Sequence, residues 1–149
     1  MLEKEKLYRQ IQETVEQKIA VAERSIASAK ESRDNDTKSS AGDKYETGRE
    51  MMQAEINKSE AQLNVALQLK EDLQRINLDR TYSFVEQGSL VVTNLGKYFI
   101  SIGIGRVFLG KEEFYCISLA SPIGKLLFKK SVGDKVKFNE REFLIKEIV

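Results

Sequence analysis

Two carboxylates stand out because their spacing and setting suit the binding of a metal ion. Asp43 and Glu46 lie three residues apart, directly after Gly42, where two long helix-forming segments meet. Residues three apart share one face of a helix. Mg²⁺ prefers oxygen ligands and keeps several of its waters, so one or two carboxylates can suffice when a second molecule supplies the rest. The pair therefore predicts a site that is presented to another molecule's active site.

A plainer interpretation of the same acids is structural. Carboxylates in the first turn of a helix offset the helix dipole, and each contributes about 0.3–1 kcal/mol. Ser39 or Ser40 would then cap the helix that carries them. Two further acids, Asp34 and Asp36, are interpreted as turn residues, with a general cation-binding cluster as the alternative. On the residues alone, the structural interpretation of Asp43 and Glu46 is the preferred one.

Two amphipathic helices are predicted to position these acids, over residues 2 to about 33 and about 44 to 76. Apolar side chains recur there at spacings of three and four. In the first helix they are Leu7, Ile11, Val15, Ile19, Ala22, Ile26 and Ala29. In the second they are Tyr45, Met52, Ile56, Leu63, Ala66, Leu69, Leu73 and Ile76. Because such narrow stripes need a partner, we expect an antiparallel helical hairpin, an intramolecular coiled coil with its tip near residues 34–46. A dimeric coiled coil is the alternative.

The composition changes near residues 77–82. Seven of the nine glycines, ten of the twelve aromatic residues and the only proline lie at or beyond position 82. Alternating apolar residues predict strands over 89–94, 97–105, 113–119, 135–139 and 142–149. Ser121 and Pro122 predict the start of a short helix that ends near residue 128. The sequence thus predicts an α+β protein, with a helical hairpin over 1–77 and a small antiparallel β-rich domain with one short helix over 78–149.

Composition also limits the function. The net charge of +1 argues against a strongly basic nucleic-acid-binding protein, and the absence of histidine removes imidazole chemistry. The single cysteine, Cys116, cannot form an internal disulfide, and its place in an alternating strand predicts a buried, small apolar residue. The charged start and the lack of a long apolar run predict a cytoplasmic protein without a membrane span. We do not expect an enzyme that acts alone.

A cluster of lysines gives the second domain its positive charge. Residues 78–149 carry 11 basic and 8 acidic side chains, hence +3, whereas residues 1–77 carry 13 and 15, hence −2. The cluster consists of Lys125, Lys129, Lys130, Lys135 and Lys137. It predicts a docking surface for an acidic partner. Ordinary lysines that keep the protein in solution are an equal alternative.

The second domain contains a run of fourteen residues that forms a recognisable motif. It consists of Ser121-Pro122-Ile123-Gly124-Lys125-Leu126-Leu127-Phe128-Lys129-Lys130-Ser131-Val132-Gly133-Asp134. This run resembles the C-terminal signature of a known family, the bacterial Gre transcript-cleavage factors. The pair Gly88-Ser89 resembles the start of the family's C-terminal domain. A long helical hairpin followed by a small β-rich domain is also the family's order of elements.

The predicted tip resembles the same family. The element Gly42-Asp43-x-x-Glu46 matches the spacing of the family's tip motif. The chain departs from the family pattern at Lys44 and in the four residues 47–50, which read Thr-Gly-Arg-Glu. The chain is therefore identified as a divergent member.

This resemblance implies a mechanism that uses another protein's active site. The C-terminal domain, expected to be FKBP-like in shape, would dock on RNA polymerase with Ser121 and Pro122 in the docking surface and Lys125 beside them. Shape alone implies no isomerase activity. The hairpin would enter the secondary channel, where Asp43 would be the principal ligand of a second Mg²⁺ shared with the polymerase. Glu46 would be a second ligand or would orient the attacking water. The polymerase would then cut backtracked RNA.

The remaining expectations concern partners. Arg49 lies one helical turn beyond Glu46, and we infer from its position that it contacts RNA phosphate or the polymerase. The resemblance implies RNA polymerase as the partner, the nascent RNA 3′ end as an indirect one, DNA as a neighbour in the complex, and a monomeric chain. One alternative is a regulator that occupies the secondary channel without promoting cleavage. Another, of a different class, is a coiled-coil structural or adaptor protein.

Overall fold

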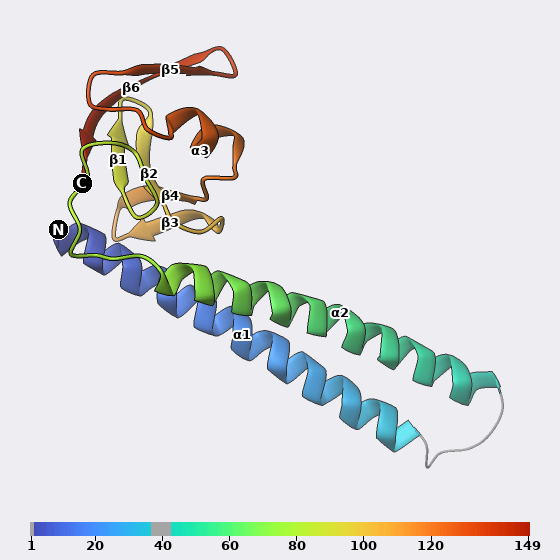
Figure 1. Cartoon of the computed structure of the whole chain (residues 1–149). Coiled ribbons are helices and arrows are strands. Elements are labelled where there is room, and N and C mark those ends of the chain that lie inside the picture. Colours follow the sequence, from blue (N-terminus) through green and yellow to red (C-terminus); the bar gives the residue numbers. More distant parts are fainter. Residues whose placement is uncertain (1, 37–42) are drawn as a thin grey trace. The chain divides into compact units, whose positions relative to one another are not determined.

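Two long α-helices form an antiparallel hairpin. The computed structural model describes the backbone of residues 2–36 and 43–149, and the side chains of residues 3–35 and 46–149. Helix α1 spans Leu2–Asp36 and helix α2 spans Asp43–Gln74. The two helices lie side by side (Figure 1), so the predicted hairpin is confirmed. At 1.5 Å per residue, the 35 residues of α1 extend about 52 Å. Within the described ranges, no helix has the length and apolar character needed to cross a membrane.

The seam between the helices is apolar. The predicted stripe of α1 is buried throughout, apart from the half-buried Ile26. On α2, Ile56, Ala66 and Leu73 are buried, and so is Ser59, which lies on the same face. Ser59 is absent from the predicted stripe because a hydroxyl carries no apolar signal.

Polar contacts between the helices lie at the edge of this seam. Lys70 Nζ is 2.9 Å from Glu16 Oε1, and Arg33 Nη1 donates to Gln53 Oε1 at 2.9 Å. Exposed ion pairs of this kind contribute about 1 kcal/mol or less. The apolar seam therefore supplies most of the stability of the hairpin.

The second half of the chain forms one six-stranded sheet with a short helix. The strands are β1 (Leu90–Thr93), β2 (Gly96–Ile100), β3 (Gly105–Leu109), β4 (Glu112–Ile117), β5 (Lys135–Phe138) and β6 (Arg141–Ile148), and helix α3 spans Pro122–Leu127. Their order in the sheet is β3-β4-β2-β1-β6-β5. The α+β class and the short helix are confirmed.

The sheet is not antiparallel throughout. Strands β2 and β4 pair in parallel, with Tyr98 opposite Tyr115, while the other four neighbouring pairs are antiparallel. Parallel neighbours need a crossover connection, and here the chain makes it through β3. The local alternation of apolar residues predicts strands but does not report this longer-range connection.

Strand β3 was also missed as a separate element. The segment 97–105 was expected to be one strand, whereas β2 ends at Ile100 and the chain turns before β3 begins at Gly105. Gly105 adopts a φ of +81°, a conformation that favours glycine. The glycines within this apolar run therefore mark a break between two strands, whereas a bulge or bend within one strand was predicted.

Helix α3 packs on an apolar cluster built from the sheet. The buried members of the cluster are Val85, Val91, Tyr98, Ile100, Leu127, Val136, Phe143 and Ile145. Cys116 is fully buried in β4, and burial raises the pKa of its thiol to about 12. Its predicted role as a small apolar residue is confirmed.

The contacts within the chain define two compact units. One contains Met1–Gln12 and Glu71–Val149, and the other contains Glu13–Lys70. The first turns of α1 thus belong to the unit of the sheet, and their side chains Leu7 and Ile11 are buried. The division into domains 1–77 and 78–149, which is inferred from the change in composition, remains a prediction.

An unexpected buried charge lies in the unit of the sheet. Lys4 is 1% exposed, its Nζ donates to the main-chain oxygen of Val149 at 3.0 Å, and it lies 4.6 Å from the centroid of the Tyr82 ring. Burial lowers the pKa of Lys4 from 10.5 to about 8. A shift of this size corresponds to at most about 3 kcal/mol of lost stability while the lysine is protonated.

We expect Lys4→Met to stabilise this unit in a pH-dependent way. At pH 7 Lys4 is protonated in both the folded and the unfolded chain, so the wild type bears the full cost of burying its charge. The variant avoids this cost but loses the hydrogen bond of Lys4, so it should be about 1–2 kcal/mol more stable. Between pH 8 and 10 the folded wild type releases this proton before the unfolded chain does, so wild-type stability rises and the difference shrinks. Urea unfolding at pH 7 and 9.5 measures both. An equal difference at the two pH values would contradict the assignment.

Candidate functional site

The predicted tip acids lie at the start of α2. Asp43 is the first residue of this helix, and Glu46 follows in the first turn with its side chain exposed. The side chains of Asp43 and Tyr45 lie outside the described side chains, and Ser39, Ser40 and Gly42 lie outside the described residues. The first turn of a helix favours negative charge. This placement suits both the structural and the metal-binding interpretation of the pair.

The residues around the tip acids are polar and largely exposed. Arg49 and Glu50 are exposed on the second turn of α2. At the end of α1, Asp34 Oδ1 is 3.2 Å from Arg33 Nε. Asp36 is the last residue of α1, and its side chain lies outside the described ones. Asp34 and Asp36 thus lie in the last turn of α1 and not in the turn predicted for them, because the helix continues past its predicted end near residue 33.

The tip acids suit a metal ion that is shared with another molecule. Among the residues that the structure describes, no three His, Cys, Asp or Glu side chains are grouped as a metal site. Two carboxylates fit the oxygen preference of Mg²⁺, which retains water ligands or takes further ligands from a partner. The donor set of Asp43 and Glu46 is thus appropriate for part of an Mg²⁺ site.

The second predicted site surrounds the start of α3. The Ser121 hydroxyl accepts a hydrogen bond from the Gly124 N–H at 3.0 Å and donates to the Ser118 carbonyl at 2.7 Å. Pro122, the first helical residue, and Lys125 are both exposed. Ser121 therefore caps α3 as predicted, and its hydroxyl is engaged in holding the turn.

We expect Gly124→Ala to destabilise the sheet unit by about 1–3 kcal/mol, through overpacking. A Cβ atom at this position would lie 2.2 Å from the Ser118 carbonyl oxygen, which belongs to the backbone that the cap holds. Gly103→Ala is the matched control, because its Cβ would meet nothing within 4 Å. Urea unfolding compares the two variants. Equal stability of both would show that the turn before α3 can move freely.

Several exposed apolar side chains on α3 and on the segments beside it were not predicted. Phe84 and Phe128 are 54% and 40% exposed, and Leu126 and Val132 are also exposed. A β-bridge pairs Phe84 with Ser131, which connects this residue to the segment 126–132. We call the docking patch these four apolar residues together with Lys125, Lys129 and Lys130. Large apolar residues outside any periodic stripe were the signal in the sequence that could have revealed it.

The lysine cluster divides between this patch and strand β5. Lys129 lies with its Nζ 5.3 Å from the centroid of the Phe128 ring. On β5, Lys135 pairs with Glu142 at 3.6 Å, and Lys137 is exposed. The docking patch thus combines apolar side chains with three exposed cations, which suits a partner surface that is apolar and acidic.

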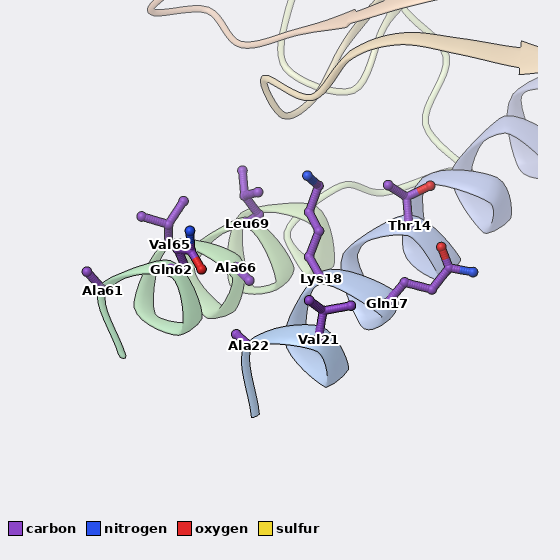
Figure 2. Close-up of a pocket in the computed structure, with 10 residues that line it drawn as sticks. All are labelled: Thr14, Gln17, Lys18, Val21, Ala22, Ala61, Gln62, Val65, Ala66 and Leu69. Carbon is purple, nitrogen blue, oxygen red and sulfur yellow. The ribbon is translucent and has the colours of Figure 1, made fainter. Parts of the chain in front are cut away.

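The hairpin carries a separate groove of about 690 Å³ (Figure 2). Its lining consists of Thr14, Gln17, Lys18, Val21, Ala22, Ala61, Gln62, Val65, Ala66 and Leu69. The side chains come from both helices and are mainly apolar, with Lys18 as the one charged residue in the lining. This lining has no carboxylate, thiol or imidazole.

Comparison with known proteins gives a limited result. No protein-family model matches the sequence, and no curated protein matches it. Among solved structures, the crystal structure of GreA factor homolog 1 (Gfh1) of Thermus thermophilus is similar, with 21% sequence identity. The similarity covers 92% of this chain and 93% of that chain, with a TM-score of 0.37. At this identity and TM-score, the likeness does not establish a family for this chain.

Proposed function

We propose that the chain is an RNA polymerase factor that acts through the secondary channel and stimulates Mg²⁺-dependent cleavage of backtracked RNA by the polymerase. The observation that carries this proposal is the position of Asp43 at the first residue of α2, with the exposed Glu46 one turn away. Both acids of the tip motif thus lie at the start of α2, a helix that is long enough to reach into a channel. The role assigned to these acids follows from the family resemblance of the motif.

The docking patch supports the same function. The motif from Ser121 to Asp134 covers α3 and the segment that displays Leu126, Phe128 and Val132. A protein that borrows another enzyme's active site needs such a surface, because the tip acids alone give too little contact for specific binding. We assign polymerase docking to this patch, together with Ser121 and Pro122 at its edge.

The chemistry at the tip depends on residues from both proteins. Asp43 and Glu46 would hold part of the coordination shell of an Mg²⁺ ion, and the polymerase the rest. Once bound, the ion would supply charge neutralisation at the scissile phosphate and a lowered pKa for the attacking water. Glu46 is exposed on the first turn of α2, so it suits a role in orienting that water. Arg49, on the next turn, is placed to contact RNA phosphate or the polymerase.

In this proposal the chain is not itself an enzyme and works where the polymerase does, in the cytoplasm. The test is binding of the wild-type chain to cognate core RNA polymerase, measured by fluorescence anisotropy of a label at the engineered position Gln10→Cys in a Cys116→Ala background. We expect saturable binding in the micromolar range or tighter. Absence of binding at about 50 μM would exclude a polymerase factor and leave the structural or adaptor class.

A further inference from the structure

Lys129 has a backbone conformation that lysine rarely adopts. Its φ is +65°, in the left-handed region where a side chain crowds the backbone. Among the described residues, the other non-glycine residues with positive φ are Asn139 and Glu140. These two form the tight turn between β5 and β6, where a two-residue hairpin loop requires this conformation. Lys129 lies outside that loop, directly after the C-cap Phe128 of α3, in a turn that the Lys130 N–H closes onto the Leu127 carbonyl. A left-handed residue is common at this place after a helix, but it is usually glycine.

The backbone around Lys129 is fixed by hydrogen bonds that need no lysine. Its N–H donates to the Val85 carbonyl at 2.8 Å, and the Lys130 carbonyl accepts from the Val85 N–H at 2.9 Å. The Lys130 N–H donates to the Leu127 carbonyl at 3.0 Å. Glycine would make the same bonds without the steric cost. The side chain at this position is therefore not explained by the fold.

The Lys129 side chain does have a defined place in the docking patch. It is exposed, and its Nζ lies 5.3 Å from the centroid of the exposed Phe128 ring. Val132 and Phe84 present exposed apolar side chains from the same hydrogen-bonded segments. A rigid backbone thus carries a cation within an apolar surface. Residues that keep an unfavourable backbone conformation are concentrated at functional sites.

We propose that Lys129 is the specificity-determining cation of the docking patch and that it pairs with a carboxylate on the partner surface. This inference rests on the proposed function, which makes RNA polymerase the partner. A charge within an apolar interface rejects partners that leave it unpaired, so it selects the acidic surface and fixes its orientation. The constrained backbone presents the charge with little further loss of freedom on binding.

The experiment measures the Kd for core polymerase and the Tm of three variants. Lys129→Gln keeps the strained backbone and loses the charge, Lys129→Arg keeps the charge, and Lys129→Gly loses both the charge and the strain. We expect Lys129→Gln and Lys129→Gly to weaken the Kd for cognate core polymerase about tenfold, and Lys129→Arg to bind within about twofold of the wild type. Only Lys129→Gly should raise Tm, by about 2–4 °C.

Matched controls separate the effects of charge and strain. Lys111→Gln removes an exposed lysine from the turn between β3 and β4 and should leave the Kd unchanged. Glu140→Gly relieves the backbone strain of a residue with a φ of +64° outside the docking patch, so it should raise Tm without changing the Kd. Wild-type affinity for Lys129→Gln, or an equal loss for Lys111→Gln, would overturn the role of Lys129 while leaving the proposed function standing. A wild-type chain that does not bind polymerase would overturn both.

Discussion

Asp43→Asn is expected to slow stimulated RNA cleavage about 100-fold or more while leaving the hairpin folded. An amide oxygen carries no net charge, so it binds Mg²⁺ much more weakly than a carboxylate does. A metal ion can supply several kcal/mol of transition-state stabilisation, and each 1.4 kcal/mol corresponds to a tenfold change in rate. The rate is measured as shortening of labelled RNA in backtracked complexes of the cognate polymerase, at saturating concentrations of the variant.

The control for Asp43→Asn is the same substitution at Asp34. This acid lies in the last turn of α1 and is 3.2 Å from Arg33, so Asp34→Asn should stimulate cleavage by the polymerase as fast as the wild type does. Asparagine is also accepted at the start of a helix, so circular dichroism should show equal helix content for both variants. If Asp43→Asn stimulated cleavage as well as Asp34→Asn, the acids would have only the structural role of offsetting the helix dipole.

Removing both aromatic side chains of the docking patch should abolish polymerase binding without unfolding the protein. Phe84→Ser with Phe128→Ser is expected to weaken the Kd about 100-fold or more, because aromatic side chains at the centre of an interface each account for about 2 kcal/mol or more. Both rings are about half exposed in the free chain, at 54% and 40%, so Tm should change little. Anisotropy titration with core polymerase and thermal unfolding measure the two effects.

Phe108→Ser provides a matched control for this pair. Phe108 is 53% exposed, close to the value for Phe84, but it lies on the edge strand β3. Its removal should leave the affinity unchanged if the docking patch is the binding surface. An equal loss of affinity from Phe108→Ser would move the interface toward β3 and away from α3.

The periodicity of the sequence was sufficient to predict the two long helices and their buried faces. Leu7, Ile11 and Val15 on α1 and Ile56 and Ala66 on α2 follow helical spacing, and all are buried. This works because burial of one helical face is a local property of the sequence. The parallel pairing of β2 with β4 is instead a long-range property, and no local pattern encodes it.

The candidate site was predictable only in part, for two reasons. The cap at Ser121 and Pro122 follows local rules for the start of a helix, and the structure has the expected hydrogen bond to Gly124. In contrast, Lys4 becomes buried, and Phe84 approaches the segment after α3, only when distant parts of the chain come together. Their surroundings depend on tertiary contacts, which composition and spacing do not report.

The most direct test of the central claim is whether the wild-type chain accelerates RNA cleavage in backtracked complexes of its cognate polymerase. The 5′-labelled transcript should shorten faster with the chain present than with the polymerase alone. This acceleration should require Mg²⁺, and it should reach its maximum at the chain concentration that saturates polymerase binding. Saturated binding with no acceleration would contradict the claim and identify a regulator that occupies the channel without promoting cleavage.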